Sequence, residues 1–345
     1  LIQNLKNGET KLVEVPCPIL DDNYVLIQTK SSLVSLGTEK MLVDFGKANL
    51  IKKARQQPEK VKQVINKIKT DGFKTTIDAV NRKLDNPIPL GYCNAGVVIG
   101  VGKNVTEFKI GDRVASNGPH SEIVSVSKNL VAKIPDNVSF REASFTVVGA
   151  IGLQGIRLVN PSYGETVVVI GLGLIGIITC QILLSNGCKV LGFDNNSEKI
   201  NLAKKLGIEC FLSKSNSCEI VLEKTKSIGA DSVIITASTK SSEVISQSAQ
   251  MCRKRGKIVL VGVVGLDIQR SDFYEKELLF QVSCSYGPGR YDVNYEEKGI
   301  DYPIGFVRWT EKRNFETILD SLSKKKLDVT SLITEEEEFE NFNKI

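Results

Sequence analysis

The stretch VVVIGLGLIGIITCQILL, Val167–Leu184, decides how this chain folds. It lies within 23 consecutive uncharged residues between Glu165 and Lys189, a run long enough to cross a bilayer as one helix. The same residues also fit a strand, a glycine turn and a helix that together form half of a nucleotide-binding site. These two interpretations predict unrelated functions, so the local pattern has to separate them.

The pattern around this stretch favours the nucleotide-binding fold. Residues 166–170, TVVVI, form a β-branched run of strand length, and the turn GLGLIG follows before an apolar segment of helical length. KVLGFDNN then predicts a second strand that ends at Asp194, and SEKINLAKKLG predicts a helix that opens at Ser197 and stops at Gly207. A membrane-spanning helix needs neither a strand at its start nor a second strand and helix after it.

The glycines of the turn have the spacing of a dinucleotide site. Gly171 permits the tight turn out of the strand, and Gly173 lets the backbone approach a diphosphate without a Cβ in the way. Gly176 lets the following helix pack closely on the sheet. That helix, which starts with Leu174 and Ile175, directs free N–H groups and the positive end of its dipole toward the phosphates. The turn is therefore predicted to bind a dinucleotide.

Asp194 predicts which dinucleotide is bound. It lies 23 positions after Gly171, where the acidic residue that accepts the ribose hydroxyls of the cofactor belongs. A 2′-phosphate beside this carboxylate would meet a repulsion of about 4 kcal/mol at ~4 Å and an effective dielectric of ~20. That is roughly a thousandfold in affinity. Asn195 and Asn196 follow it and offer no arginine for such a phosphate, so we expect NAD(H) rather than NADP(H).

The segments after Gly207 repeat the alternation of strand and helix. DSVIITAS from Asp231, KIVLVGVVG from Lys257 and LLFQVSCS from Leu278 predict strands, and SSEVISQSAQMC from Ser241 predicts a helix between the first two. Such an alternation is typical of a parallel, doubly wound α/β sheet. Ligands of these sheets bind outside the carboxyl ends of the strands.

A basic segment, residues 44–88, precedes this fold. Pro58 suits the first position of a helix, and apolar residues recur at helical spacing after it and again after Asp71-Gly72. Eleven Lys or Arg residues against three acidic ones lie between Lys47 and Lys83, so we expect two or three amphipathic helices with basic outer faces. They form either a solvated cover of a neighbouring domain or a surface that attracts an anionic substrate. Nucleic-acid or membrane binding is disfavoured because only Phe45 and Phe73 supply aromatic rings.

The order of motifs along nearly the whole chain resembles the medium-chain dehydrogenase/reductase superfamily. These motifs are LVEVPCP near the start, SLGTE from Ser35, PLGYCNAGVVIGVGKNVTEFKIGDRV from Pro89, the cofactor turn, and KIVLVGV. More narrowly, SNGPHSEIV and SYGPGRYDVNYEEKGIDYPIGFVRWTEKRNFE resemble the N-terminal dehydrogenase half of bi-domain oxidoreductases. Those proteins carry a second domain of Gfo/Idh/MocA type, so either a fused domain or a single-domain relative is compatible with this chain.

The resemblance implies two domains, as the length of 345 residues also suggests. The expected fold class is α/β, with a Rossmann doubly wound parallel sheet that binds NAD over residues 150–285. A β-rich GroES-like catalytic domain is expected over residues 1–149, with the helical basic insert at 44–88. Residues 286–345 are expected to return to the catalytic domain.

The chain departs from the zinc members of the superfamily at their metal ligands. Where those enzymes have Cys and His ligands this chain has Leu36 and Tyr92, and the third ligand falls near Val147. The four-cysteine structural lobe is missing as well, because GDRVASNG runs directly into PHSEIV. The resemblance therefore implies a zinc-free site, in which a proton donor replaces the metal as electrophile unless the substrate is itself activated.

Three residues are candidates for that proton chemistry. Thr38 lies where the superfamily has its proton-relay hydroxyl, although it could instead cap the helix that SLGTEKMLV begins. Tyr92 replaces a metal-binding histidine, although it could simply pack with its hydroxyl satisfied. His120, the single histidine, falls in a loop that lines the substrate pocket of relatives, although a lone histidine is more often a surface residue. Cys93, beside Tyr92, is expected to be a buried thiol.

Further cofactor residues follow from the resemblance. Lys199 matches a lysine that reaches the adenosine ribose from the helix after Asp194. The residues that end two strands are expected to face the ribose and the nicotinamide: Thr236, Ala237, Ser238, Val261, Gly262 and Val263. No metal-binding residue is expected.

The predicted function is a zinc-independent, NAD(H)-dependent oxidoreductase that acts on a carbonyl or an alcohol. By resemblance, the leading substrate class is a sugar or nucleotide sugar of polysaccharide biosynthesis. A quinone or enone reductase and a non-catalytic NAD(H)-binding module stay open as alternatives. We expect a small-molecule substrate, a homodimer, and neither nucleic-acid nor membrane partners. No leader precedes Leu1, so a cytoplasmic location is expected.

Overall fold

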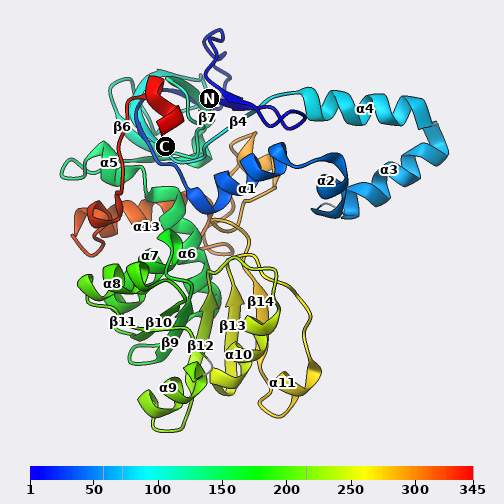
Figure 1. Cartoon of the computed structure of the whole chain (residues 1–345). Helices are drawn as coiled ribbons and strands as arrows, with labels where there is room; N and C mark the ends of the chain where they lie inside the picture. Colours follow the sequence, from blue (N-terminus) through cyan, green and yellow to red (C-terminus); the bar gives the residue numbers. More distant parts are fainter. Residues whose placement is uncertain (57, 72, 215, 345) are drawn as a thin grey trace.

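The computed structural model describes residues 1–56, 58–71, 73–214 and 216–344, and a few helical side chains, that of Thr38 among them, lie outside the described set. The chain is built on two larger sheets, one parallel and one antiparallel, which occupy opposite ends of the molecule (Figure 1). The predicted α/β fold class, a Rossmann sheet with a GroES-like β-rich part, is confirmed. The boundaries between the domains stay a prediction.

The parallel sheet has the strand order β11-β10-β9-β12-β13-β14. Its strands are β9 (Thr166–Ile170), β10 (Lys189–Asp194), β11 (Glu209–Leu212), β12 (Ala230–Ile235), β13 (Cys252–Leu260) and β14 (Leu279–Val282). The helices between and after them are α7 (Leu174–Ser185), α8 (Ser197–Lys205), α9 (Ser217–Lys224), α10 (Glu243–Met251) and α11 (Arg270–Tyr274). This order reverses between β9 and β12, which is the switch point where such sheets bind ligands.

The uncharged stretch of the sequence is the centre of this sheet. Val167 and Val169 of β9 point into one hydrophobic core, and Val168 and Ile170 point into the core on the opposite face. A strand covered on both faces needs apolar residues at every position, which explains why residues 167–170 of the run are all Val or Ile. The run is divided between β9 and the separate helix α7, as predicted. Among the described residues, the chain forms no helix with the length and apolar character that a membrane crossing requires.

The antiparallel part contains a five-stranded sheet in the order β7-β3-β5-β6-β8 and a small sheet in the order β2-β1-β4. The strands are β1 (Ile2–Gln3), β2 (Thr10–Lys11), β3 (Tyr24–Ser32), β4 (Ile88–Pro89), β5 (Asn94–Val101), β6 (Arg113–Ser116), β7 (Ile123–Ser127) and β8 (Val131–Lys133). Helix α1 (Leu36–Lys47) follows β3, and α5 (Phe140–Ala143) and the short turn η1 (Lys128–Leu130) accompany the sheet. In Figure 1, α1 is drawn between this sheet and the parallel sheet.

The predicted basic insert forms helices α2 (Leu50–Gln56), α3 (Pro58–Asp71) and α4 (Phe73–Asp85). The expectation of two or three helices, one of them starting at Pro58, is confirmed. Figure 1 shows α3 and α4 extending away from both sheets. Lys6 holds the base of this arm, because its Nζ pairs with Asp85 Oδ2 at 2.8 Å and its carbonyl accepts from Lys53 Nζ at 3.3 Å. The insert is thus a projecting arm and not a cover over the antiparallel sheet.

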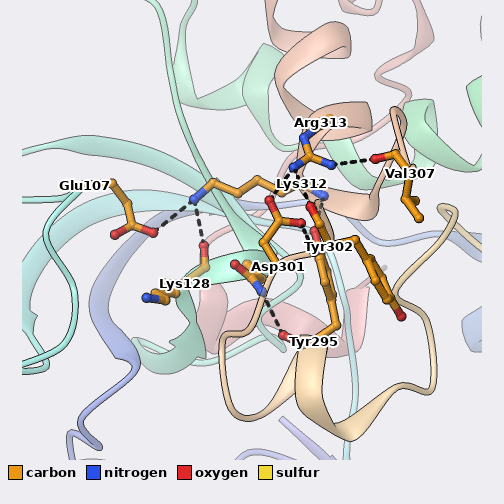
Figure 2. A network of polar contacts seen from close by, with 9 residues as sticks. Glu107, Lys128, Tyr295, Asp301, Tyr302, Val307, Lys312 and Arg313 are labelled. Atoms are coloured by element: carbon orange, nitrogen blue, oxygen red, sulfur yellow. Dashed lines mark hydrogen bonds and ion pairs between the residues drawn. The ribbon is translucent and has the colours of Figure 1, made fainter. Parts of the chain in front are cut away.

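The last part of the chain joins the two sheets. It contains α12 (Val293–Glu296), α13 (Glu311–Ser323), η2 (Thr330–Leu332) and η3 (Phe339–Lys344), and α13 packs on α6 (Thr146–Val159). Two neighbouring residues at the start of α13 bind different partners (Figure 2). Lys312 Nζ lies 3.3 Å from Glu107 Oε1 and 3.2 Å from the Lys128 carbonyl, whereas Arg313 pairs with Asp301. The segment after β14 is therefore fixed to the antiparallel part at several points.

Beside these contacts, Glu311 is buried without a cation to pair with it in the described part of the chain. Its side chain is fully enclosed, and neither carboxyl oxygen accepts a hydrogen bond from a described residue. Burial, and then the nearby Glu296 through its charge and a hydrogen bond, raise the pKa of Glu311 to about 9. Arg290 approaches the group but pairs with Glu296. The Glu311 carboxyl is therefore neutral at pH 7.

This burial predicts a loss of stability at alkaline pH. Because the folded-state pKa of Glu311 lies above its ordinary 4.5, the folded chain holds a proton that the unfolded chain releases. Its contribution to stability is full below about pH 4.5 and falls as the pH rises toward 9. Glu311→Gln keeps the shape of the side chain but cannot ionise, so its melting temperature should fall by several degrees less than that of the wild type over this pH range. The difference corresponds to about 2–4 °C for each kcal/mol of stability. Glu316→Gln, exposed on the same helix, is the control and should melt like the wild type at each pH. A melting curve of Glu311→Gln with the wild-type pH dependence would contradict the assignment.

Candidate active site

The glycine turn after β9 is closely packed on one side and open on the other. Gly171 has a φ of +98°, and a Cβ there would lie 2.6 Å from the Ala237 backbone nitrogen. A Cβ on Gly176 would lie 1.8 Å from the Gly171 carbonyl oxygen. Gly173 has open space around its Cα and occupies the N-cap position of α7, ahead of Leu174 and Ile175. The turn therefore presents the free N–H groups of α7 to an open surface, as the sequence predicts for a diphosphate site.

Asp194, at the end of β10, lies against this turn. Its Oδ2 accepts a hydrogen bond from the Leu172 backbone at 2.7 Å, and its Oδ1 accepts one from the Asn196 backbone at 2.8 Å. Lys199 Nζ lies 3.8 Å from the same carboxylate. The structure thus brings together Asp194, Lys199 and the glycine turn. Asn196, which the sequence analysis did not single out, caps α8 through its side chain.

The ends of β12 and β13 lie beside the turn. Thr236 Oγ1 donates to the Gly171 carbonyl at 2.5 Å, so the hydroxyl fixes the turn. Gly262 is needed for packing, because a Cβ there would lie 2.1 Å from the Ala237 carbonyl oxygen. Ser238 and Val263 form an isolated parallel bridge, and Val263 is largely exposed, whereas Val261 packs against Gly155. The six predicted residues therefore lie along one edge beside Gly171. Some of them pack against neighbouring backbone, as Gly262 does, and others are exposed, as Val263 is.

In the antiparallel part, His120 is buried in a chain of hydrogen bonds. Its ring is 3% exposed, and its Nδ1 lies 2.8 Å from Ser32 Oγ. Its Nε2 lies 2.9 Å from Glu39 Oε2, and Glu39 Oε1 accepts from the Ser35 backbone at 2.8 Å. His120 lies in the loop between β6 and β7, as one alternative expected, but it is not a surface residue. The sequence analysis missed Ser32 and Glu39, because their link to a histidine some 80 positions away depends on tertiary structure.

The two other candidates lie in the same region. Tyr92 is half-buried and packs against the core of the antiparallel part. Gly91, which precedes it, touches His120, because a Cβ there would lie 2.6 Å from the ring. Thr38 lies in α1, three positions after the N-cap residue Ser35, and its side chain is outside the described set.

Cys93 follows Tyr92 and is completely buried, which confirms the prediction of a buried thiol. Burial, and then the nearby Glu39 carboxylate, raise the pKa of Cys93 well above its ordinary value. A thiol that stays protonated is a poor nucleophile and a poor metal ligand.

The side chains at the metal positions of zinc relatives do not fit zinc. Leu36 and Val147 have no donor atom, and Tyr92 is a phenol in place of an imidazole. Leu36 is 64% exposed at the start of α1, and Val147 is buried in α6. Among the described residues, no three His, Cys, Asp or Glu side chains are grouped so as to hold a metal ion.

Comparison with known proteins finds a dehydrogenase family model and dehydrogenase relatives. The family model described as zinc-binding dehydrogenase matches residues 175–298, a region that contains none of Leu36, Tyr92 and Val147. An alcohol dehydrogenase of Geobacillus stearothermophilus is 26% identical over 209 residues, which cover 51% of this chain and 61% of that protein. A D-guloside 3-dehydrogenase of Escherichia coli is 27% identical over 256 residues, or 71% of this chain and 68% of that protein.

Solved structures extend the likeness to the whole fold. The crystal structure of 2R,3R-butanediol dehydrogenase from Bacillus subtilis has a TM-score of 0.69 at 18% identity and covers 95% of this chain and 89% of its own. The fold and the turn define a two-part α/β protein with a nucleotide-type site. Taken with the family model and the relatives, they support the medium-chain dehydrogenase/reductase superfamily that the sequence motifs resemble.

The open space at Gly173 allows folding and binding to be separated. Gly173→Ala should keep the wild-type melting temperature, because its φ of −73° suits alanine and a Cβ there meets no atom. The methyl would lie where a diphosphate must approach the backbone, so we expect at least tenfold weaker NADH binding by fluorescence titration, a loss of about 1.4 kcal/mol.

The matched control is Gly305→Ala, where a Cβ also meets open space but lies outside the turn. It should bind NADH like the wild type. Equal NADH affinity of the two variants would show that the cofactor does not approach Gly173.

Proposed function

We propose that this chain is an NAD(H)-dependent oxidoreductase that works without zinc and moves a hydride between nicotinamide and a carbonyl or alcohol group. The observation that carries the proposal is the glycine turn at the start of α7 with Asp194 fixed beside it. The similarity to dehydrogenases supports the same reaction type.

The residues of the turn fit a dinucleotide cofactor. The N–H groups at the start of α7 would bind its diphosphate, and Asp194 and Lys199 would bind the adenosine ribose. When bound, the nicotinamide supplies or accepts the hydride. The exposed Val263 and the edge around Ser238 would lie along the rest of the cofactor.

Asp194 supports NAD(H) over NADP(H). Its carboxylate is held by two backbone N–H groups and is not free to turn away from a 2′-phosphate. Lys199 is the one basic side chain that pairs with it in the described structure, at 3.8 Å. Neither Asn195 nor Asn196 offers a further cation, so a 2′-phosphate would meet the Asp194 carboxylate with Lys199 as the one paired cation in the described structure.

The misfit at Leu36, Tyr92 and Val147 supports zinc independence, and His120, whose ring lies against Gly91 beside Tyr92, is then an acid–base group next to one of these positions. A conjugated enone or a quinone also needs no Lewis acid, so the same misfit favours a quinone or enone reductase as the second candidate function. Turnover of simple enones without any sugar would distinguish this second function.

A sugar or nucleotide sugar is the substrate class that we propose. The D-guloside 3-dehydrogenase relative acts, by its name, on a sugar derivative. The basic arm of α2, α3 and α4 would draw an anionic substrate of this kind toward the protein. We further propose a homodimer through β14, because it is an edge strand of the parallel sheet and exposes Leu279 and Val282.

The proposal is tested by NADH oxidation with a panel of nucleotide sugars, free sugars, simple ketones and enones. We expect hydride transfer to at least one carbonyl sugar, and protein freed of metal by a chelator should react as fast as untreated protein. Turnover that is lost with the metal and restored by zinc would contradict zinc independence. Binding of NADH with no turnover of any substrate would leave only a binding module and would contradict the oxidoreductase.

Asp194→Asn tests the cofactor preference. Removing the charge should lower the ratio of NADH affinity to NADPH affinity at least tenfold. The repulsion between the carboxylate and a 2′-phosphate corresponds to a difference in affinity of roughly a thousandfold at most. Asp136→Asn, at an exposed position of the antiparallel part, should leave the ratio unchanged. Tighter binding of NADPH than NADH by the wild type would overturn the preference.

A further inference from the structure

A continuous line of hydrogen bonds lies in the antiparallel part, in the region of Leu36 and Tyr92. It starts at Glu39 in the first turn of α1, passes through His120 between β6 and β7, and ends at Ser32, the last residue of β3. The two contacts of the ring are 2.9 Å to Glu39 and 2.8 Å to Ser32. Three separate segments of the chain are therefore needed to assemble it.

The three side chains differ in burial, and this gives the line a direction. His120 is 3% exposed and Glu39 is 6% exposed, so neither reaches a bound molecule easily. Ser32 is half-buried and is the most exposed of the three. The line thus leads from a buried carboxylate to a half-buried hydroxyl.

The carboxylate fixes the proton on the ring. A carboxylate only accepts hydrogen bonds, so Nε2 carries a hydrogen that it donates to Glu39. Nδ1 is then free to exchange a proton with Ser32 Oγ. The Ser35 N–H on the other carboxyl oxygen holds Glu39 in place.

The other groups that face His120 leave this arrangement undisturbed. Cys93 lies close to Glu39 and stays a neutral thiol. The Leu1 nitrogen donates to the His120 carbonyl at 2.7 Å, on the backbone and not on the ring. Gly91 packs against the ring and has no side chain.

We infer that Glu39, His120 and Ser32 form the proton relay of this enzyme, with the Ser32 hydroxyl as the group that exchanges the proton with the substrate oxygen. The inference rests on the proposed function. Ser32 is then a catalytic residue, and Glu39 is a positioning residue that acts through the histidine. It differs from the resemblance-based expectation, in which Thr38 supplies the relay hydroxyl.

The proton balance of carbonyl reduction follows from the line. As the carbonyl carbon gains a hydride, its oxygen takes the proton of Ser32 Oγ, and a new O–H bond replaces the C=O π bond. Ser32 regains a proton from Nδ1 of the imidazolium form of His120. The ring is left neutral, and its Nε2–H still donates a hydrogen bond to Glu39. Water returns one proton to the relay before the next turnover. Alcohol oxidation is the reverse.

Ser32→Ala tests the exit hydroxyl. We expect hydride transfer to slow at least a hundredfold, within the range of about 10²–10⁴ for a lost general acid, with unchanged NADH affinity. Ser32→Thr keeps a hydroxyl and should stay within tenfold of the wild type. Ser127→Ala removes a buried serine hydroxyl that has no hydrogen-bond partner in the described structure, and it is the matched control.

Glu39→Gln tests the positioning role through the hydrogen on the ring. An amide can donate to Nε2 as well as accept from it, so the hydrogen is no longer fixed at Nε2, and reduction should slow at least tenfold with unchanged NADH affinity. A merely structural role for Glu39 would leave the Nε2 hydrogen of the folded Glu39→Gln variant protected.

His120 is the single histidine, so its ring nitrogens can be followed by NMR without substrate. The wild type should show an Nε2-bound hydrogen protected from exchange, and Glu39→Gln should expose it. If the wild type turns over and Ser32→Ala is as fast as Ser127→Ala, the relay is wrong and the proposed function stands. If NADH binds and no carbonyl is reduced, the proposed function fails and the relay fails with it, whatever the NMR shows.

Discussion

The fold and the site both depend on the close contact between Gly176 and the Gly171 carbonyl, where any Cβ would overlap the oxygen at 1.8 Å. This contact lets α7 begin directly behind β9 and directs its free N–H groups to the open side of the turn. Thr236 and Asp194 then bind the turn from the neighbouring strands. A substitution that moved α7 outward would therefore disturb the parallel sheet and the cofactor site together.

The second constraint lies in the antiparallel part, where a leucine, a tyrosine and a valine occupy the positions of metal ligands in zinc relatives. In the antiparallel part the buried carboxylate of Glu39 contacts the ring of His120. Burying both groups is costly unless they are paired, and here each oxygen of Glu39 has a donor. This part of the protein therefore contains a buried, hydrogen-bonded acid–base pair.

The parallel sheet could be predicted from the sequence because its signals are local. The β-branched run of residues 166–170, the glycine spacing and Asp194 each lie on one continuous segment. The link from Ser32 to Glu39 through His120 could not be predicted, because it joins three segments whose register depends on the antiparallel sheet. Neither could the buried, unpaired Glu311, since a glutamate in the first turn of a helix is ordinarily exposed.

The most direct test of the central claim is a crystal structure of the chain with NADH. The account predicts the diphosphate on the N–H groups between Gly173 and Ile175, and the adenosine ribose hydroxyls on Asp194. A well-ordered NADH bound elsewhere, with the turn in contact with no phosphate, would contradict it.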